Sequence, residues 1–317
     1  MSGSEAVVLA TYTRSGFTEG EHLGHMVLVG PDGRVRQAWG DPDLVIFPRS
    51  SNKPAQAIAM VASGLDLPDE LLALAASSHS GEGFHIDAVR RILASAGLTD
   101  AALQTPPDFP LDPRARDAWA AAGHGAEPIA MNCSGKHAAM LATCVAREWP
   151  LTTYLDPRHP LQVAARATLE ELSGEGVQHV GVDGCGAPVM AVSLAGLARM
   201  LSSAVQQPVD APGGRVTRAM AAHPEVVGGT RRDVTAFMRA VPGLVAKDGG
   251  EGVYVAALPD GTALAVKAVD GSERARQVAL AEGLIAAGVP ADALAGLRTI
   301  ALLGGGRPVG EVSSPLR

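Results

Sequence analysis

Aromatic residues are scarce in this sequence: they make up 3% of its 317 residues, so alanine, valine and leucine must fill the core. Basic residues are not in excess either. The net charge of -7 argues against a nucleic-acid partner and gives no reason to expect binding to an anionic membrane surface. No apolar run reaches the ~18 residues expected of a membrane-spanning helix. What remains is the composition of a globular protein, with 47% hydrophobic and 19% charged residues.

Two further shortages concern the cellular compartment. The N-terminal segment Met1–Glu5 lacks the basic region and apolar stretch of a secretory signal, and we expect a cytoplasmic protein. The three cysteines, Cys133, Cys144 and Cys185, cannot all pair within one chain. In a reducing compartment we expect thiols, metal ligands or core residues rather than a disulfide framework. Cys144 lies in a helical apolar pattern and is expected in the core.

Strand patterns lie at the two ends of the chain, and helical patterns lie between them. The turn sequences Pro31-Asp32-Gly33 and Pro259-Asp260-Gly261 each separate two strand-like segments, which predicts two hairpins. The expected strands are residues 6–13, 25–29, 34–39, 252–258 and 262–270, and the expected helices are residues 54–62, 84–96, 136–149, 161–172, 189–201 and about 273–287.

These patterns predict an α+β fold. Isolated hairpins are marginal in water, so the strands are expected to join one antiparallel sheet built from both chain ends. We predict a single domain over residues 1–317 with two lobes, in which the sheet comes from about residues 5–40 and 250–290 and the middle of the chain forms a helical lobe.

The segment Phe47–Pro54 carries the first candidate for catalysis, a serine three residues before a lysine at the start of a predicted helix. Positions i and i+3 share one face of a helix, so the side chains of Ser50 and Lys53 can meet. A serine hydroxyl is a weak nucleophile and needs a base, and a lysine serves if burial or a neighbouring cation lowers its pKa. The alternative is that Ser50 simply caps the helix, because Ser-x-x-Lys arises by chance in many proteins.

A second polar loop and a late lysine strengthen this hypothesis. Residues 77–83 follow the apolar run Leu71–Ala76, and Lys267 lies on a predicted strand near the end of the chain. Serine hydrolases of the penicillin-binding class use a Ser-x-x-Lys at a helix start, a polar loop and a lysine on a late strand, in this order. Taken singly, Ser78 and Ser80 fit loop caps equally well, and Lys267 fits an exposed strand residue.

Cys133 and Cys185 lie in small, turn-forming segments at predicted helix starts, and Lys136 and His137 follow the first of them closely. Two thiolates could bind a soft divalent metal, with an imidazole or another donor completing a tetrahedron. The spacing is not that of a zinc finger, since each segment contributes one cysteine. Two alternatives stay open: both cysteines are buried small residues at tight turns, or Cys133 is a nucleophile beside Lys136 or His137.

Taken together, these segments resemble the bacterial asparaginase II family, the class typified by the inducible rhizobial asparaginase. The resemblance runs from about Val8 to Asp270 with the motifs in the family's order. It rests on Pro48-Arg49-Ser50-x-x-Lys53-Pro54-x-Gln56-Ala57, Ala76-Ser77-Ser78-His79-Ser80, Asn132-Cys133-Ser134-Gly135-Lys136-His137, Asp183-Gly184-Cys185, His223-Pro224-Glu225 and Val266-Lys267. It implies a penicillin-binding/serine β-lactamase-like fold, hydrolysis of L-asparagine to L-aspartate and ammonia, and a homodimer.

The resemblance also implies roles for individual residues. It implies two Ser-Lys tandems, Ser50 with Lys53 and Ser78 with Lys267, and a zinc site close to them. The implied zinc ligands are Cys133, Lys136 and Cys185, and the candidate substrate-binding residues are Arg49, Asp183, His79 and Ser80. Ser77 directly precedes Ser78, so the identity of the second hydroxyl stays open. The stretch Gly304–Gly306 has no assignment.

The implied mechanism is an acyl transfer to Ser50, with Lys53 as the base and with Ser78 and Lys267 relaying a proton to the departing ammonia. Neighbouring lysines depress each other's pKa, which predicts an alkaline optimum. Arg49 is the expected partner of the substrate's α-carboxylate, and Asp183 that of its α-ammonium. Zinc is expected to shape the pocket rather than to act as the Lewis acid, because lysine is an odd third ligand for a catalytic zinc.

Two other functions are compatible with the same residues. The first is another enzyme of this fold, such as a glutaminase, a β-lactamase or a peptidase, because the fold does not choose between them. The second is a non-catalytic sensor or zinc-binding scaffold. Two Ser-Lys pairs count against a sensor, which has no need of them.

Overall fold

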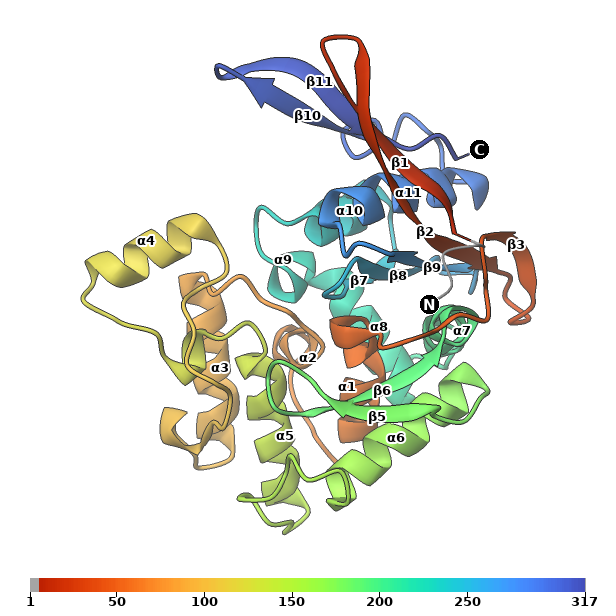
Figure 1. Cartoon of the computed structure of the whole chain (residues 1–317). Coiled ribbons are helices and arrows are strands. Elements are labelled where there is room, and N and C mark those ends of the chain that lie inside the picture. Colours follow the sequence, from red (N-terminus) through yellow and green to blue (C-terminus); the bar gives the residue numbers. More distant parts are fainter. Residues whose placement is uncertain (1–5, 317) are drawn as a thin grey trace.

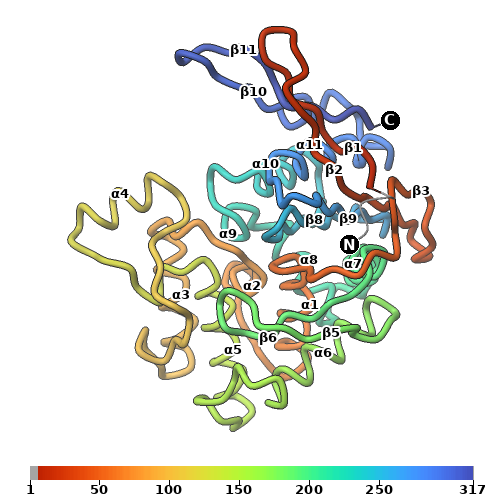
Figure 2. Tube along the Cα trace, in the orientation of Figure 1, coloured from red at the N-terminus to blue at the C-terminus, as the bar shows by residue number. Residues whose placement is uncertain are grey.

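Both ends of the chain contribute to one antiparallel sheet of eight strands, in a computed structural model that describes residues 6–316. The strand order is β10-β11-β1-β2-β9-β8-β7, and β3 pairs with β2. The strands are β1 (Val7–Arg14), β2 (Phe17–Val29), β3 (Val35–Trp39), β7 (Val245–Asp248), β8 (Val253–Ala257), β9 (Ala263–Ala268), β10 (Thr299–Gly304) and β11 (Arg307–Ser313). The N-terminal and C-terminal hairpins lie side by side and extend beyond the body of the molecule (Figure 2).

The centre of the sheet is covered on both faces. Strands β7, β8 and β9 are buried along their whole length. Strands β8 and β9 are rich in valine and alanine rather than alternating, and β7 ends in the charged pair Lys247-Asp248. Helix α11 (Glu273–Ala286) packs on one face and α7 (Leu194–Val205) on the other (Figure 1). Helix α11 approaches closely because it carries Gly283, where a Cβ atom would lie 2.5 Å from the Leu264 side chain.

The helical lobe surrounds α1 (Lys53–Ala62), which is buried from Lys53 to Val61. The helices around it are α2 (Asp69–Ala75), α3 (Gly83–Ser95), α4 (Pro113–Ala121), α5 (Ser134–Ala146), α6 (Pro160–Ser173), α8 (Pro212–Ala222), α9 (Pro224–Val227) and α10 (Asp233–Ala240). The short turns are η1 (Arg49–Asn52), η2 (Asp100–Ala102) and η3 (Pro128–Ala130). A small second sheet has the order β4-β6-β5, from Val45–Ile46, Pro188–Ser193 and His179–Val182.

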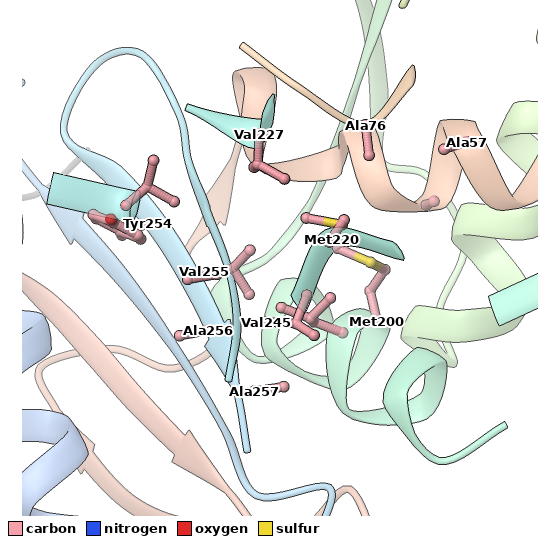
Figure 3. Close-up of a cluster of buried hydrophobic side chains, with 14 of the residues drawn as sticks. Ala57, Ala76, Met200, Met220, Val227, Val245, Tyr254, Val255, Ala256 and Ala257 are labelled. Carbon is pink, nitrogen blue, oxygen red and sulfur yellow. The ribbon is translucent and has the colours of Figure 1, made fainter. Parts of the chain in front are cut away.

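The lobe and the large sheet share one apolar core. In Figure 3, Met200 of α7 and Met220 of α8 lie beside Val245 of β7, with Ala57 and Ala76 of the lobe close by. Transfer of this apolar surface from water holds the two parts together. The packing brings the start of α1 against the end of β7, and this seam is where the candidate site lies.

The predicted fold class is confirmed: an antiparallel sheet from both chain ends carries a helical lobe built from the middle of the chain. The helix predicted over 189–201 is wrong in its first half. Residues 188–193 form β6, which pairs with β5, and α7 begins only after Ser193, whose hydroxyl accepts the Gly196 N–H. The unassigned stretch Gly304–Gly306 closes the β10–β11 hairpin, with positive φ at Gly305 and Gly306. Among the described helices, none is long and apolar enough to cross a membrane.

Candidate active site at the seam between lobe and sheet

The Ser-x-x-Lys segment lies where the lobe meets the sheet. Turn η1 runs directly into α1, and the Ser50 carbonyl accepts the backbone N–H of Lys53. Ser50 is half-buried, whereas Lys53 is 1% exposed. The hydroxyl of Ser51 donates to the carbonyl of Lys247 at 3.1 Å, which fixes η1 to strand β7. Ser50 therefore lies one helical turn from a lysine that is buried inside the seam.

The amine of Lys53 contacts the hydroxyl of Ser78 and not that of Ser77. It lies 2.9 Å from Ser78 Oγ, 2.5 Å from the Ser77 carbonyl oxygen and 3.1 Å from Cys133 Sγ. The Ser77 side chain is buried, and its hydroxyl has no hydrogen-bond partner among the described residues. The polar loop after α2 and the start of α5 thus meet at the Lys53 amine, whereas the sequence motifs pair Ser78 with Lys267.

Every lysine of this chain is buried. The sequence contains only four, Lys53, Lys136, Lys247 and Lys267, and they are between 0% and 8% exposed. Lysines are almost never buried unless they are paired, because the charged amine loses its hydration. Because all four lysines are buried, their amines need partners inside the protein.

Lys247, at the end of β7, is the lysine whose charge interacts with that of Lys53. Its amine lies 2.5 Å from Asp248 Oδ1 and 2.7 Å from the Asp248 carbonyl oxygen. Complete burial lowers the pKa of Lys247 to about 8, Asp248 opposes this shift, and the charge of Lys53 adds to it. An amine with this pKa is present in both protonation states near neutral pH, which suits proton transfer.

Lys267 is not brought to Ser78. It lies on β9 opposite Val253 of β8, and β8 separates it from β7, so the two lysine-bearing strands are about 10 Å apart. Its amine donates to the Glu251 carbonyl. Burial lowers the pKa of Lys267, and Arg49 contributes in the same direction while Glu251 opposes it. The predicted pairing of Ser78 with Lys267 is absent from the structure because the register of β9 places this amine beside the β7–β8 turn.

Arg49 and Asp183 form an ion pair next to Ser50. Arg49 Nε donates to Asp183 Oδ1 at 2.7 Å, and Arg49 Nη1 lies 3.6 Å from Glu251 Oε1. Burial would raise the pKa of Asp183, but the Arg49 hydrogen bond holds it below its ordinary value. Arg49 and Glu251 both adopt left-handed backbone conformations, with φ of 52° and 56°. Such conformations cost about 1–3 kcal/mol in non-glycine residues and are common at ligand-binding sites.

The other two predicted substrate-binding residues have internal partners. His79 is fully buried, with Nε2 2.9 Å from Ser134 Oγ, and burial lowers its pKa well below the ordinary value. The Ser80 hydroxyl donates to the Gly228 carbonyl at 2.8 Å. Ser80 also lines a cavity of about 340 Å³ that it shares with Asp112 and Arg231. Their hydrogen bonds give both residues a part in holding the loop that presents Ser78.

The two cysteines and Lys136 meet under the Lys53 amine. Lys136 Nζ lies 3.2 Å from Cys185 Sγ, and both cysteines are buried in one small cluster. A hydrogen bond from Cys185 lowers the pKa of Cys133, and Lys53 and Lys136 lower it further. The same hydrogen bond raises the pKa of Cys185. Cys133 is thereby favoured as a thiolate, the form that binds metals and attacks electrophiles.

This donor set fits a soft divalent ion. Two sulfurs and an amine lie within contact distance, and thiolates select soft metals. Within residues 6–316 no three His, Cys, Asp or Glu side chains cluster for a metal, so an ion held here would depend on Lys136 as third donor. The cysteines raise the pKa of Lys136 although burial acts against them, so the amine must lose a proton before it can bind a metal. Cys144, in contrast, is a core residue of α5, and burial raises its pKa to about 11.

Comparison with known proteins identifies the class. The sequence profile described as L-asparaginase II matches residues 10–314, nearly the whole chain. The chain belongs to the L-asparaginase II family, and the match continues through β10 and β11, beyond Asp270 where the motif resemblance ended. No curated relative matches the chain.

Three solved structures share part of the chain arrangement. Mglu in its native form is 16% identical with a TM-score of 0.43, and the match covers 83% of this chain and 64% of that chain. A β-lactamase (Mb2281c) from Mycobacterium bovis is 15% identical with a TM-score of 0.46, and the match covers 83% of this chain and 94% of that chain. EstCE1, a hydrolase with promiscuous acyltransferase activity, is 12% identical with a TM-score of 0.36, and the match covers 84% of this chain and 91% of that chain. The chain spans slightly less than two thirds of the Mglu chain.

Sequence reasoning missed Lys247 and its partner Asp248. Two signals could have found them. One is the composition, because a chain with 26 basic residues but only four lysines makes each lysine a candidate. The other is the short apolar strand that ends in Lys247-Asp248 before Gly249-Gly250, where the backbone approaches η1 closely.

Proposed function

We propose that this protein is an L-asparaginase that hydrolyses L-asparagine to L-aspartate and ammonia through an acyl-enzyme on Ser50. The observation that carries the proposal is the position of the Lys53 amine, which is buried one turn below Ser50 and hydrogen-bonded to Ser78 Oγ at 2.9 Å. A serine three residues before a buried lysine at a helix start, with a second hydroxyl on the lysine amine, is an arrangement suited to acyl transfer.

In the first half of the reaction, Ser50 Oγ forms a bond to the carboxamide carbon of the substrate, and its proton passes to the free amine of Lys53. The C–N bond then breaks. Ser78 hands its proton to the departing nitrogen, which leaves as ammonia, and takes a replacement from Lys53. In the second half, water adds to the ester carbon and gives its proton to the same relay. The Ser50–carbon bond breaks, the relay returns that proton to Ser50 Oγ, and aspartate leaves.

Lys247 supplies the second amine of this scheme in place of Lys267. The charge of Lys53 disfavours the protonated form of Lys247. Because Lys247 has a pKa of about 8, kcat/KM should rise with pH through that region. The expected alkaline optimum therefore has a specific group behind it.

The substrate is proposed to be a zwitterionic amino acid. Arg49 and Asp183 present opposite charges 2.7 Å apart beside Ser50, which matches an α-carboxylate and an α-ammonium on one carbon. The strained φ of Arg49 aims its guanidinium at this position and is sustained by the turn that carries Ser50. A side-chain amide would then reach the serine from the same anchor.

Zinc is proposed as the ion of the cysteine site. Cys133, Cys185 and Lys136 would hold it, and when bound it would supply a fixed positive charge next to the catalytic amines. The Cys133 sulfur also contacts the Lys53 amine at 3.1 Å, so these ligands position Lys53 directly.

Ammonia release tests the function. Purified protein is assayed with L-asparagine, L-glutamine and a chromogenic β-lactam, each with and without chelator. We expect ammonia from asparagine at the highest kcat/KM. A higher kcat/KM for glutamine or for the β-lactam would refute asparagine as the preferred substrate. If none of the three is turned over, the protein is a binding protein and the proposed function is wrong.

Alanine variants of two serines distinguish loss of the nucleophile from general effects of a mutation on the protein. Ser50→Ala should abolish turnover while the folded structure is kept, as seen by circular dichroism. Ser63→Ala, at the other end of α1 and also half-buried, serves as the matched control and should keep the parent activity. Near-normal activity of Ser50→Ala would refute the nucleophile assignment.

A further inference from the structure

Lys247 belongs to a buried group of charged side chains. Lys247 is 0% exposed and Asp248 is 4% exposed. The Lys247 amine donates to the Asp248 carbonyl and to Oδ1 of its carboxylate. A lysine that hydrogen-bonds the residue next to it can reach few other partners, so Asp248 decides where this amine lies.

Asp248 is itself held by two arginines. Arg232, just before α10, donates to Asp248 Oδ2, and Arg276 Nη2 of α11 lies 3.6 Å from the same oxygen. Arg276 also donates to the carbonyls of Gly249 and Val253 and lies over the Tyr254 ring, with its guanidinium 5.3 Å from the ring centroid. The two arginines therefore hold the carboxylate from two elements, Arg232 at the N-cap of α10 and Arg276 on α11.

We propose that Asp248, clamped by Arg232 and Arg276, is a positioning residue that fixes the Lys247 amine in the seam and sets the balance between its charged and neutral forms. The proposal deepens the proposed amide hydrolysis. Only its expected effect on turnover rests on that proposed function. The placement of the amine follows from the contacts themselves.

The charges around Lys247 act in opposite directions. Burial, Lys53 and Arg232 favour the neutral amine, whereas Asp248 favours the ammonium. The ionisable groups that face this cluster are Asp248 on β7, Lys53 on α1, Arg232 and Asp233 at the start of α10, Glu273 and Arg276 on α11, and Tyr254 on β8. Asp233 is half-buried, and the desolvation of its carboxyl raises its pKa.

Two substitutions should therefore move the titration of Lys247 in opposite directions. Asp248→Asn removes the one neighbour that favours the ammonium, so the pKa of Lys247 should fall by about one unit or more. Arg232→Gln removes a repelling cation and frees Asp248 for the lysine, so the pKa should rise. A purely structural role would give loosening in both variants and no opposed shifts.

The titration can be read without substrate. With only four lysines in the chain, protein labelled with 13C at lysine Cε should give four lysine signals, and Lys247→Met identifies one of them by its loss. We expect the Lys247 midpoint near pH 8 in the parent, lower in Asp248→Asn and higher in Arg232→Gln. Asp248→Glu should restore most of the parent midpoint. Arg239→Gln, on the exposed side of α10, is the control and should leave it unchanged.

If Asp248→Asn fails to fold, the upward shift in Arg232→Gln decides, and an unchanged or lower midpoint there overturns the proposal. The pH profile of kcat/KM for asparagine then gives the second readout. A rising limb that moves with the Lys247 midpoint supports the positioning role in turnover. Opposed NMR shifts without any turnover would refute the proposed function while leaving the clamp established, and absent NMR shifts with normal turnover would refute the clamp alone.

Discussion

Burial of the Lys247 amine should lower the free energy of unfolding in a pH-dependent way, and Lys247→Met should remove this contribution. In the native state the pKa of this amine is about 8, against an ordinary value of 10.5. Between these two values the unfolded chain binds more protons than the folded one, so the free energy of unfolding rises with pH. Going from pH 7 to pH 10, the parent should gain about 2.5 kcal/mol more than Lys247→Met, at 1.36 kcal/mol per pKa unit.

Urea unfolding at constant ionic strength measures this difference. The two proteins are compared at matched pH values, and the dependence on urea must be the same for both. Subtracting the curves removes the contributions of the other ionisable groups. The difference in the free energy of unfolding between the parent and Lys267→Met should also rise with pH, but by less. Glu251 and Asp270 oppose the effect of burial on the pKa of Lys267. A difference between parent and Lys247→Met that stays flat with pH would mean that this lysine titrates normally, and the reasoning on the buried amine would fail.

Four further outcomes are expected. Ser78→Ala should lower kcat by roughly 10²- to 10⁴-fold, whereas Ser77→Ala should stay near normal, and equal losses in a steady-state assay would contradict the Lys53 contacts. Cys133→Ala combined with Cys185→Ala should lose zinc in elemental analysis, and retained zinc would place the metal elsewhere. The four lysines should resist acylation until urea unfolds the protein, as followed by mass spectrometry, and rapid native labelling would disprove their burial. Arg49→Gly should raise KM for asparagine while changing stability by no more than about 1 kcal/mol, because relief of the positive φ offsets the lost ion pair; a lower KM would exclude Arg49 as a substrate contact.

The parts of the site that could be predicted from sequence are those with short spacings. Ser50 and Lys53 are three residues apart, and a helix start fixes their relation without any tertiary information. The same holds for Cys133 and Lys136 at the start of α5. Contacts between distant segments could not be predicted in this way. The contact of Lys53 with Ser78, for example, depends on how α1 and α2 pack.

The choice between Lys247 and Lys267 could not be made from periodicity. Both lie on buried strands near the end of the chain, and an alternating or apolar pattern identifies a strand but not its register or its place in the sheet. Strand β7 has only four residues and ends at Gly249-Gly250, so it gave no separate strand signal. Lys267 lies on the longer strand and was the more visible candidate.

Two errors in the secondary structure predicted from the sequence have similar causes. Residues 189–192 are Val-Met-Ala-Val, a run too short and too apolar to separate a strand from a helix, and the cap at Ser193 marks the true start of α7. The C-terminal strands were not assigned because β10 and β11 flank the triple glycine Gly304–Gly306, which has the composition of a loop. The β11–β1 pairing that stabilises them spans the whole chain length.

The acyl-enzyme itself gives the most direct measurement. Protein mixed with L-asparagine is quenched in acid within milliseconds, digested, and searched by peptide mass spectrometry for an aspartyl ester. The account predicts the adduct on Ser50, its absence in Ser50→Ala and its accumulation when Ser78→Ala slows turnover of the ester. An adduct on Ser78 or Cys133, or steady ammonia release from Ser50→Ala, would contradict the assignment of Ser50 as the nucleophile.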